Sequence, residues 1–135
     1  MINPFDILNF LKAQAVSTLS QLISSNEFDE MGGMLTEREY KRLRRHVETK
    51  WSDEWRNNIA IDVNNIIGVT TESVLRYQVG YDMAYVDIVL NIIAVLDTAE
   101  TKYAFITVEL TKNYSPKSFG DWCISRFDVK DIKTR

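Results

Sequence analysis

Tyr85, Asp87 and Arg126 are the residues of this chain whose types could together perform chemistry. A carboxylate can act as a general base, and a guanidinium can stabilise negative charge that develops in a transition state. Tyr85 and Asp87 are two positions apart, so in an extended segment their side chains point to the same side. These residues support one hypothesis: a small-molecule-binding or isomerase/hydrolase-type pocket, with Asp87 as the base and Arg126 as the stabilising charge.

Other residue types that often perform catalysis or bind metals are sparse. His46 is the only histidine, and no Cys/His cluster has the spacing of metal ligands. Cys123 is the only cysteine, which excludes an internal disulfide and favours a reducing compartment. In a strand, between Trp122 and Ile124, it reads as a small buried hydrophobic residue. We therefore favour a chain with no catalytic set, no metal and no cofactor, in which His46 is a surface histidine.

Basic residues gather on one side of a predicted helix that ends near Lys50. This basic face could meet anionic lipid headgroups or RNA, because each Lys or Arg near an anionic membrane contributes about 1 kcal/mol. A plain solvated face is the alternative, since Glu37, Glu39 and Glu48 dilute the charge. The predicted basic face consists of Arg38, Lys41, Arg42 and Arg45.

The composition is that of an ordinary globular domain. The chain has 135 residues, of which 45% are hydrophobic and 26% charged, and this length fits a single domain, 1–135, with one core. The net charge of −3 comes from intermixed acids and bases, which argues against a whole-domain grip on DNA. Asp87 and Asn91 interrupt the longest apolar stretch, so no membrane span is expected. Neither a secretory signal nor a mitochondrial presequence is visible.

Helix signals occupy about residues 4–60. An apolar stripe at helical spacing predicts a first helix, which a Gly-Gly pair at 32–33 separates from the next. Thr36, with Glu39 three residues later, reads as a capping box in which each side chain satisfies the other's backbone N–H. A second helix follows, and Ser52 is a fitting N-cap for a short third one.

Strand signals occupy about residues 66–132. The links between successive strands are too short for parallel crossovers, so neighbouring strands must be antiparallel. We therefore predict an α+β fold, in which the N-terminal helices pack on a curved four-stranded antiparallel meander and form a half-open cone. The predicted strands are 66–79, 83–96, 102–113 and 122–132.

Large aromatic residues are expected to line or plug this cone, because rings supply much contact area. Plain core filling is the alternative. The expected lining comprises Trp51, Trp55, Tyr77, Tyr85, Phe105 and Trp122, with Asp87 and Arg126 as polar groups among them.

Several strings resemble the mitochondrial family of Tim44-like domains, over roughly residues 14–130. They are LSQLISSNEFD at 19–29, MLTE at 34–37, DVNNI at 62–66 and WCISRF at 122–127. Among the branches of that family, the m-AAA protease-interacting proteins are the most similar. The resemblance implies a cone-shaped roll like that of nuclear transport factor two and the cystatins.

The resemblance also implies a function and a location. The chain would be a non-enzymatic adaptor in the mitochondrial matrix, peripheral to the inner membrane. Its partner would be the m-AAA protease, the mitochondrial ribosome or a translocase, with an anionic lipid surface as a further contact and no DNA. The expected contact surfaces are the basic face, the open end of the cone, and the first helix with its surplus apolar residues Ile7 and Phe10. A bacterial type IV secretion assembly domain is a further alternative, because it shares the order of helices and meander.

Overall fold

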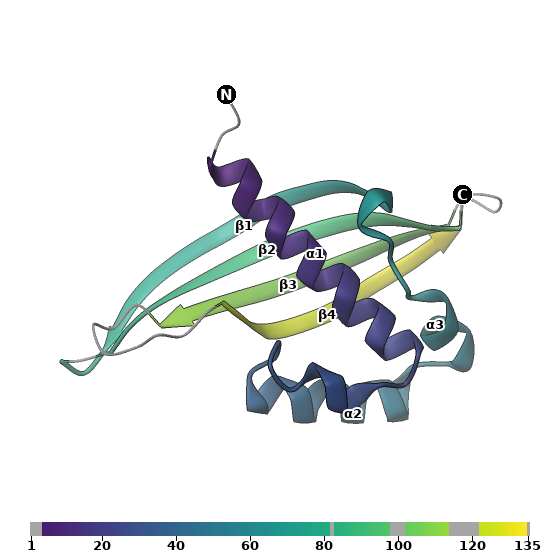
Figure 1. The fold of residues 1–135 in the computed structure, drawn as a ribbon, viewed down its shortest axis with the longest axis horizontal. Helices are drawn as coiled ribbons and strands as arrows, with labels where there is room; N and C mark the ends of the chain where they lie inside the picture. The colour runs from purple at the N-terminus through teal and green to yellow at the C-terminus, as the bar shows by residue number, and fades with distance from the viewer. Residues whose placement is uncertain (1–3, 82, 98–101, 114–121, 135) are drawn as a thin grey trace.

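The helices come first in the chain and the sheet follows (Figure 1). The computed structural model describes residues 4–81, 83–97, 102–113 and 122–134, with side chains from residue 14 to residue 133 within these ranges, Asp97 excepted. The helices are α1 (Pro4–Ser24), α2 (Glu37–Lys50) and α3 (Asp53–Asn58), with 3₁₀ turns η1 (Phe28–Met31) and η2 (Val63–Asn65). The strands are β1 (Ile66–Val79), β2 (Met83–Asp97), β3 (Lys102–Asn113) and β4 (Cys123–Thr134).

The four strands form one antiparallel sheet in the order β1-β2-β3-β4. The predicted α+β class and the antiparallel meander are confirmed, and the strands bend along their length (Figure 1). Gly80 has a φ of 68° in the turn between β1 and β2, a conformation that glycine adopts without strain. The predicted links at 98–101 and 115–120 lie outside the described residues.

One face of the sheet forms the core with the helices. Side chains of a strand alternate between two faces, and every second residue is buried on the helix side from Ile88 to Ala94 in β2 and from Ala104 to Leu110 in β3. Helix α1 crosses this face (Figure 1), and its Val16, Leu19 and Ile23 are fully buried. The sheet contributes Ile88, Leu90, Ile92, Ala94, Ala104, Ile106, Val108, Leu110, Ile124 and Phe127 to the same core.

Two serines of α1 bind the segment between α3 and β1 to that helix. The Ser17 hydroxyl donates to the carbonyl oxygen of Ile61 over 2.5 Å, and the N–H of Ile61 donates to the Ser20 hydroxyl over 3.0 Å. Both serines are buried, so these bonds satisfy a backbone unit that water cannot reach. No helix within the described ranges is long and apolar enough to cross a membrane.

Candidate functional site

Helix α2 presents one side to the core and the other to solvent. Leu43 and Val47 are buried on its inner side. At its first turn the N–H of Glu39 donates to the Thr36 hydroxyl over 3.2 Å. Only this half of the predicted capping box forms, because the N–H of Thr36 donates to the carbonyl of Ile124 instead, over 3.0 Å. The carboxylate of Glu39 therefore binds a different partner.

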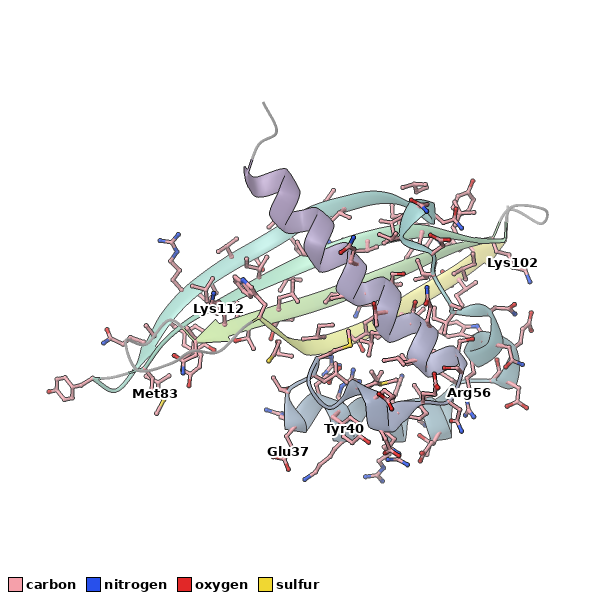
Figure 2. The ribbon with its side chains drawn as sticks, viewed as in Figure 1. Glu37, Tyr40, Arg56, Met83, Lys102 and Lys112 are labelled. Atoms are coloured by element: carbon pink, nitrogen blue, oxygen red, sulfur yellow. The ribbon has the colours of Figure 1, made fainter. Side chains whose placement is uncertain are left out.

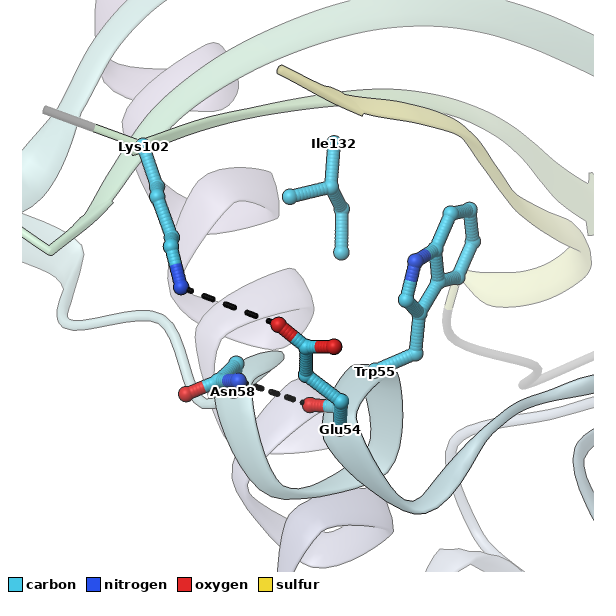
Figure 3. A pocket seen from close by; sticks show the side chains of 5 residues that line it. All are labelled: Glu54, Trp55, Asn58, Lys102 and Ile132. Atoms are coloured by element: carbon cyan, nitrogen blue, oxygen red, sulfur yellow. Dashed lines mark hydrogen bonds and ion pairs between the residues drawn. The ribbon is translucent and has the colours of Figure 1, made fainter. Parts of the chain in front are cut away.

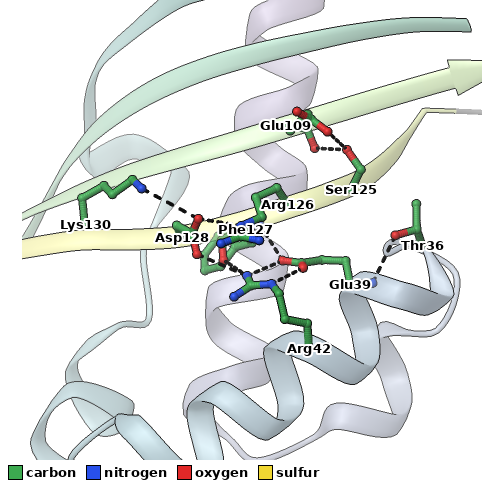
Figure 4. A network of polar contacts seen from close by, with 9 residues as sticks. All are labelled: Thr36, Glu39, Arg42, Glu109, Ser125, Arg126, Phe127, Asp128 and Lys130. Atoms are coloured by element: carbon green, nitrogen blue, oxygen red, sulfur yellow. Dashed lines mark hydrogen bonds and ion pairs between the residues drawn. The ribbon is translucent and has the colours of Figure 1, made fainter.

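That partner is the outer edge of β4 (Figure 4). The Glu39 side chain is only 2% exposed, and its Oε2 accepts a hydrogen bond from the N–H of Phe127 over 2.7 Å. Arg42 donates to both carboxylate oxygens of Glu39, and its Nη2 also donates to the carbonyl oxygen of Phe127 over 2.9 Å. Two side chains of α2 thus satisfy both backbone groups of one edge residue, as a neighbouring strand would do.

Asp128 extends this network. Its Oδ1 accepts from Arg42 Nη2 over 3.2 Å, its Oδ2 accepts from Arg126 Nε over 2.7 Å, and Lys130 Nζ lies 3.8 Å away. Burial raises the pKa of Asp128, but the hydrogen bond from Arg126 and the charges of Arg42, Arg126 and Lys130 outweigh it and hold the pKa below that of an ordinary carboxyl. The pKa of Arg42 is raised, chiefly by its hydrogen bond to Glu39.

Arg42 consequently has a different role from the other residues of the predicted basic face. Arg38, Lys41 and Arg45 are exposed on the solvent side of α2, whereas the guanidinium of Arg42 binds Glu39 and β4. A shallow hollow lies along this side of the helix and is called the α2 hollow below. It is lined by Lys41, Arg42, Arg45, His46, Thr49 and Lys50.

Two lining residues, His46 and Lys50, were not part of the predicted basic face. His46 lies four residues after Arg42, and Lys50 lies eight residues after it. Residues four apart are neighbours on a helix surface, so this spacing could have indicated that both belong to the same side of α2. His46 is exposed, in agreement with the surface histidine that the sequence predicted.

The positive charge of the α2 hollow is only partly neutralised. Lys41 pairs with Glu37 over 3.2 Å, but both side chains are mostly exposed, so the pair contributes at most about 0.5 kcal/mol. Glu48 pairs over 3.3 Å with Arg44, which does not line the hollow. Arg45 has no ion pair among the residues that the structure describes. The hollow is therefore a positively charged surface suited to anions.

A second hollow lies between α3 and the end of the sheet (Figure 3). Trp55 and Ile132 form apolar walls, and Lys102 Nζ lies 3.9 Å from Glu54 Oε1 across it. Its volume of about 110 Å³ is well below the roughly 300 Å³ at which small-molecule sites begin. Trp55, predicted to line the cone, therefore borders a small crevice at the edge of the core.

The remaining residues of the predicted cone lining occupy two different places. Trp51 is buried and Trp122 packs against the core. By register and alternation, the others lie on the face of the sheet away from the helices, called the outer sheet face below. Aliphatic side chains fill the space between helices and sheet in their place. The residues on the outer sheet face are Tyr77, Tyr85, Asp87, Phe105 and Arg126.

Asp87 and Arg126 thus share a face, as the pocket hypothesis requires, but they belong to different strands. Asp87 is opposite Thr111 of β3, whereas Arg126 is opposite Glu109 and binds Asp128. No contact among the described residues joins Asp87 to Arg126. The outer sheet face therefore brings the predicted acid–base pair onto one surface without bringing the two groups together.

The surroundings of Asp87 are partly apolar. Tyr77 and Tyr85 stack beside it with ring centroids 5.4 Å apart. Loss of water and the nearby Asp87 carboxylate raise the pKa of the Tyr77 phenol. The Oδ1 of Asp87 is shielded from solvent and has no hydrogen-bond partner in the described structure.

The described part of the chain contains a free thiol and no cluster of metal-binding side chains. No group of three or more His, Cys, Asp or Glu side chains converges there in a way that could hold a metal ion. Cys123 is a half-buried free cysteine. Comparisons of the chain with protein-family models, curated proteins and solved structures found no match.

The sequence did not draw attention to an exposed apolar surface on β1 and its hairpin with β2. Figure 2 shows Met83 at the hairpin end, far from α2 and α3. The signal was present, because residues 66–79 lack the strict alternation of β2 and so do not define a single buried face. The exposed large side chains are Ile67, Val74, Leu75, Tyr77, Val79, Tyr81 and Met83.

Proposed function

We propose that this chain is a non-enzymatic adaptor domain at the matrix face of the mitochondrial inner membrane. It engages a protease, ribosome or translocase complex, and it contacts the anionic membrane surface through α2. The compartment and the class of partner follow from the resemblance to Tim44-like domains. The membrane contact is carried by one observation: the α2 hollow is basic on its solvent side, while Glu39 and Arg42 hold the other side of the helix to β4.

Rigid attachment matters for such a contact. A charged surface attracts an anionic membrane most effectively when its cations face the lipid together, and a helix fixed to a sheet keeps them so oriented. Lys41, Arg45 and Lys50 line the α2 hollow on a single helix. At about 1 kcal/mol each, three such residues correspond to about a 100-fold gain in membrane affinity.

Vesicle flotation tests the membrane contact. The triple variant Lys41→Glu, Arg45→Glu, Lys50→Glu changes these three residues of the α2 hollow and leaves Arg42 in place, so the attachment of α2 to β4 is kept. We expect the parent chain to float with cardiolipin-containing vesicles and not with neutral ones, and the triple variant to bind at least about 100-fold more weakly. Arg44→Glu is the matched single control for Arg45→Glu, because Arg44 does not line the α2 hollow. Equal flotation of parent and triple variant would refute the membrane contact; binding of rRNA alone would transfer the role to the ribosome.

Purification from mitochondria tests the adaptor role. The tagged chain should co-purify with subunits of one of the three complexes at stoichiometric yield, and protease protection in mitoplasts should place it in the matrix. A chain that is accessible from outside the inner membrane, or that brings down none of these subunits, would contradict the proposal.

Ligand binding at the outer sheet face is the second candidate function. The unpartnered Oδ1 of Asp87 beside the stacked Tyr77 and Tyr85 favours it, because polar groups left unsatisfied are often kept for a ligand. A thermal-shift screen of small cationic and polar metabolites is the test. A compound that stabilises the parent chain and not Asp87→Val would support this candidate, and failure of every compound would count against it.

A further inference from the structure

The two edges of the sheet differ in how much of their backbone the rest of the chain satisfies. At the β4 edge, Ile124 exchanges backbone hydrogen bonds with Met34 and Thr36, of 2.8 and 3.0 Å, and Glu39 and Arg42 satisfy Phe127. At the β1 edge, no further strand pairs in the described structure. Edge strands with free N–H and C=O groups are templates for pairing with another chain unless something covers or disrupts them.

The exposed half of β1 carries few of the usual devices that discourage pairing. All residues from Glu72 to Val79 are exposed, and none is proline. Val74, Leu75 and Val79 are 51%, 58% and 51% exposed, which is costly for aliphatic side chains that face water. The register shift between Thr71 and Ser73 leaves Glu72, the first residue of this stretch, without a partner in β2, and from Ser73 to Val79 the pairing with β2 is regular.

We propose that the β1 edge pairs with the β1 edge of a second copy of this chain, in an antiparallel two-fold dimer centred on Val74. The argument is charge complementarity. Glu72 and Arg76, the two charged residues of β1, lie two positions either side of Val74. In antiparallel pairing about that residue, each Glu72 is directly opposite Arg76 of the other copy, so one symmetric contact contains two ion pairs.

Neighbouring registers lose this match. If the two strands paired about Arg76, the two guanidinium groups would be opposite each other, and like charges in that position destabilise a strand pair. Centred on Val74, the two valines meet at the axis, between the ion pairs, and Ser73 faces Leu75 of the other copy. Such an isologous contact closes after two chains, so it extends the sheet without forming fibres. At the β4 edge, residues 34–42 already occupy the backbone groups of Ile124 and Phe127.

Charge exchange at positions 72 and 76 tests the pairing. Glu72→Arg places Arg opposite Arg in both pairs, and Arg76→Glu places Glu opposite Glu, so each variant alone should dimerise at least about tenfold more weakly than the parent. Mixed together, the two variants restore both ion pairs and should form a heterodimer. The double variant Glu72→Arg, Arg76→Glu should dimerise like the parent. Both positions are exposed, and unchanged circular dichroism melting would show that each variant folds.

Disulfide trapping gives an independent readout. In a Cys123→Ser background, Val74→Cys places two thiols on the two-fold axis, where opposite Cα atoms of an antiparallel pair are about 5 Å apart and within disulfide range. Gln78→Cys is the control, because its two copies would be roughly 26 Å apart along the strands. We expect rapid covalent dimer from the first variant and little from the second.

Sedimentation velocity at rising protein concentration decides between the outcomes. A parent dimer that both single variants lose and their mixture regains supports the proposal. A chain that stays monomeric at all concentrations overturns it. A dimer that ignores the charge exchange and resists trapping at position 74 also overturns it, because that dimer would use another face.

Discussion

The carboxylate of Glu39 accepts a hydrogen bond of 2.7 Å from the backbone N–H of Phe127, a residue 88 positions further along the chain. This contact joins the helical half of the chain to its last strand and covers the edge of β4 at Phe127. It is the reason why a charged residue of a strongly polar helix is one of the most buried side chains in the structure. The structure tolerates this burial because Arg42 pairs with the same carboxylate.

Removing the carboxylate should therefore destabilise the fold. Glu39→Ala leaves the N–H of Phe127 without an acceptor, and we expect the free energy of unfolding to fall by about 2–3 kcal/mol, as for other hydrogen bonds to charged groups. Glu39→Gln should cost less, because its amide oxygen can still accept. Urea denaturation measures both. Glu37→Ala, two residues earlier and mostly exposed, should change stability by less than about 0.5 kcal/mol; equal losses for positions 37 and 39 would contradict this assignment.

Arg42 and Arg45 should differ although both belong to the predicted basic face. Arg42→Ala removes the donor to Phe127 and leaves Glu39 as an uncompensated buried charge, so we expect a loss of about 3 kcal/mol in unfolding free energy. Arg45→Ala should leave stability within about 0.5 kcal/mol of the parent. In vesicle flotation the order should reverse for variants that still fold, with Arg45→Ala the weaker binder. Similar melting temperatures for the two variants would disprove the division of roles.

Acid should weaken the attachment of α2. The pKa of Asp128 is lower in the folded chain than its unfolded value of about 3.9. Its stabilising contribution is therefore complete above that pH and is lost as the pH falls through the folded pKa. We expect Asp128→Asn to be less stable than the parent at neutral pH and to lose less stability between about pH 5 and pH 2. Urea midpoints across this range provide the measurement, with Asp29→Asn as an exposed control; parallel curves for Asp128→Asn and parent would rule out the linkage.

The serines of α1 should contribute more than their small size suggests. Ser20→Ala deprives the N–H of Ile61 of its acceptor in a buried site, and we expect a loss of about 1–3 kcal/mol in unfolding free energy. Thr18→Ala is the control, since its exposed hydroxyl bonds only to its own helix and should have little effect. Amide hydrogen exchange of Ile61 is a second readout, and it should accelerate in Ser20→Ala alone. Unchanged protection of that amide would argue that the hydrogen bond contributes nothing.

Local patterns predicted the elements of this fold closely. The period of two in β2 and β3 identified strands and the buried face of the sheet, and short links implied antiparallel order, because these features depend only on neighbours in sequence. The predicted third strand, 102–113, has the bounds of β3, and the predicted fourth, 122–132, differs from β4 by one and two residues at its ends. The first-helix residues Ile7 and Phe10, suggested as a contact surface, have side chains outside the described part of the structure.

The candidate sites were only partly predictable. Spacing on a helical wheel placed Arg38, Lys41 and Arg45 on one exposed side, and the structure agrees. The same spacing also assigned Arg42 to that exposed side, because a helical wheel shows only the residues of one helix. It gives no information about β4, which the Arg42 side chain reaches. Glu39 was read as a charge that dilutes a solvated face, yet it is buried, since its partner is supplied by β4 and not by its own helix.

The sequence by itself determined where the strands begin and end to within two residues, which strand face is apolar, and which helix is basic, because hydrophobic period, caps and turn residues act over a few positions. Tertiary structure alone decided that Glu39 and Arg42 satisfy Phe127 at the β4 edge, that β1 has only β2 as a partner among the described strands, and that Tyr85, Asp87 and Arg126 lie away from the helices. These outcomes depend on which backbone groups lack partners once the layers pack. That is a property of the assembled sheet, which no local pattern contains.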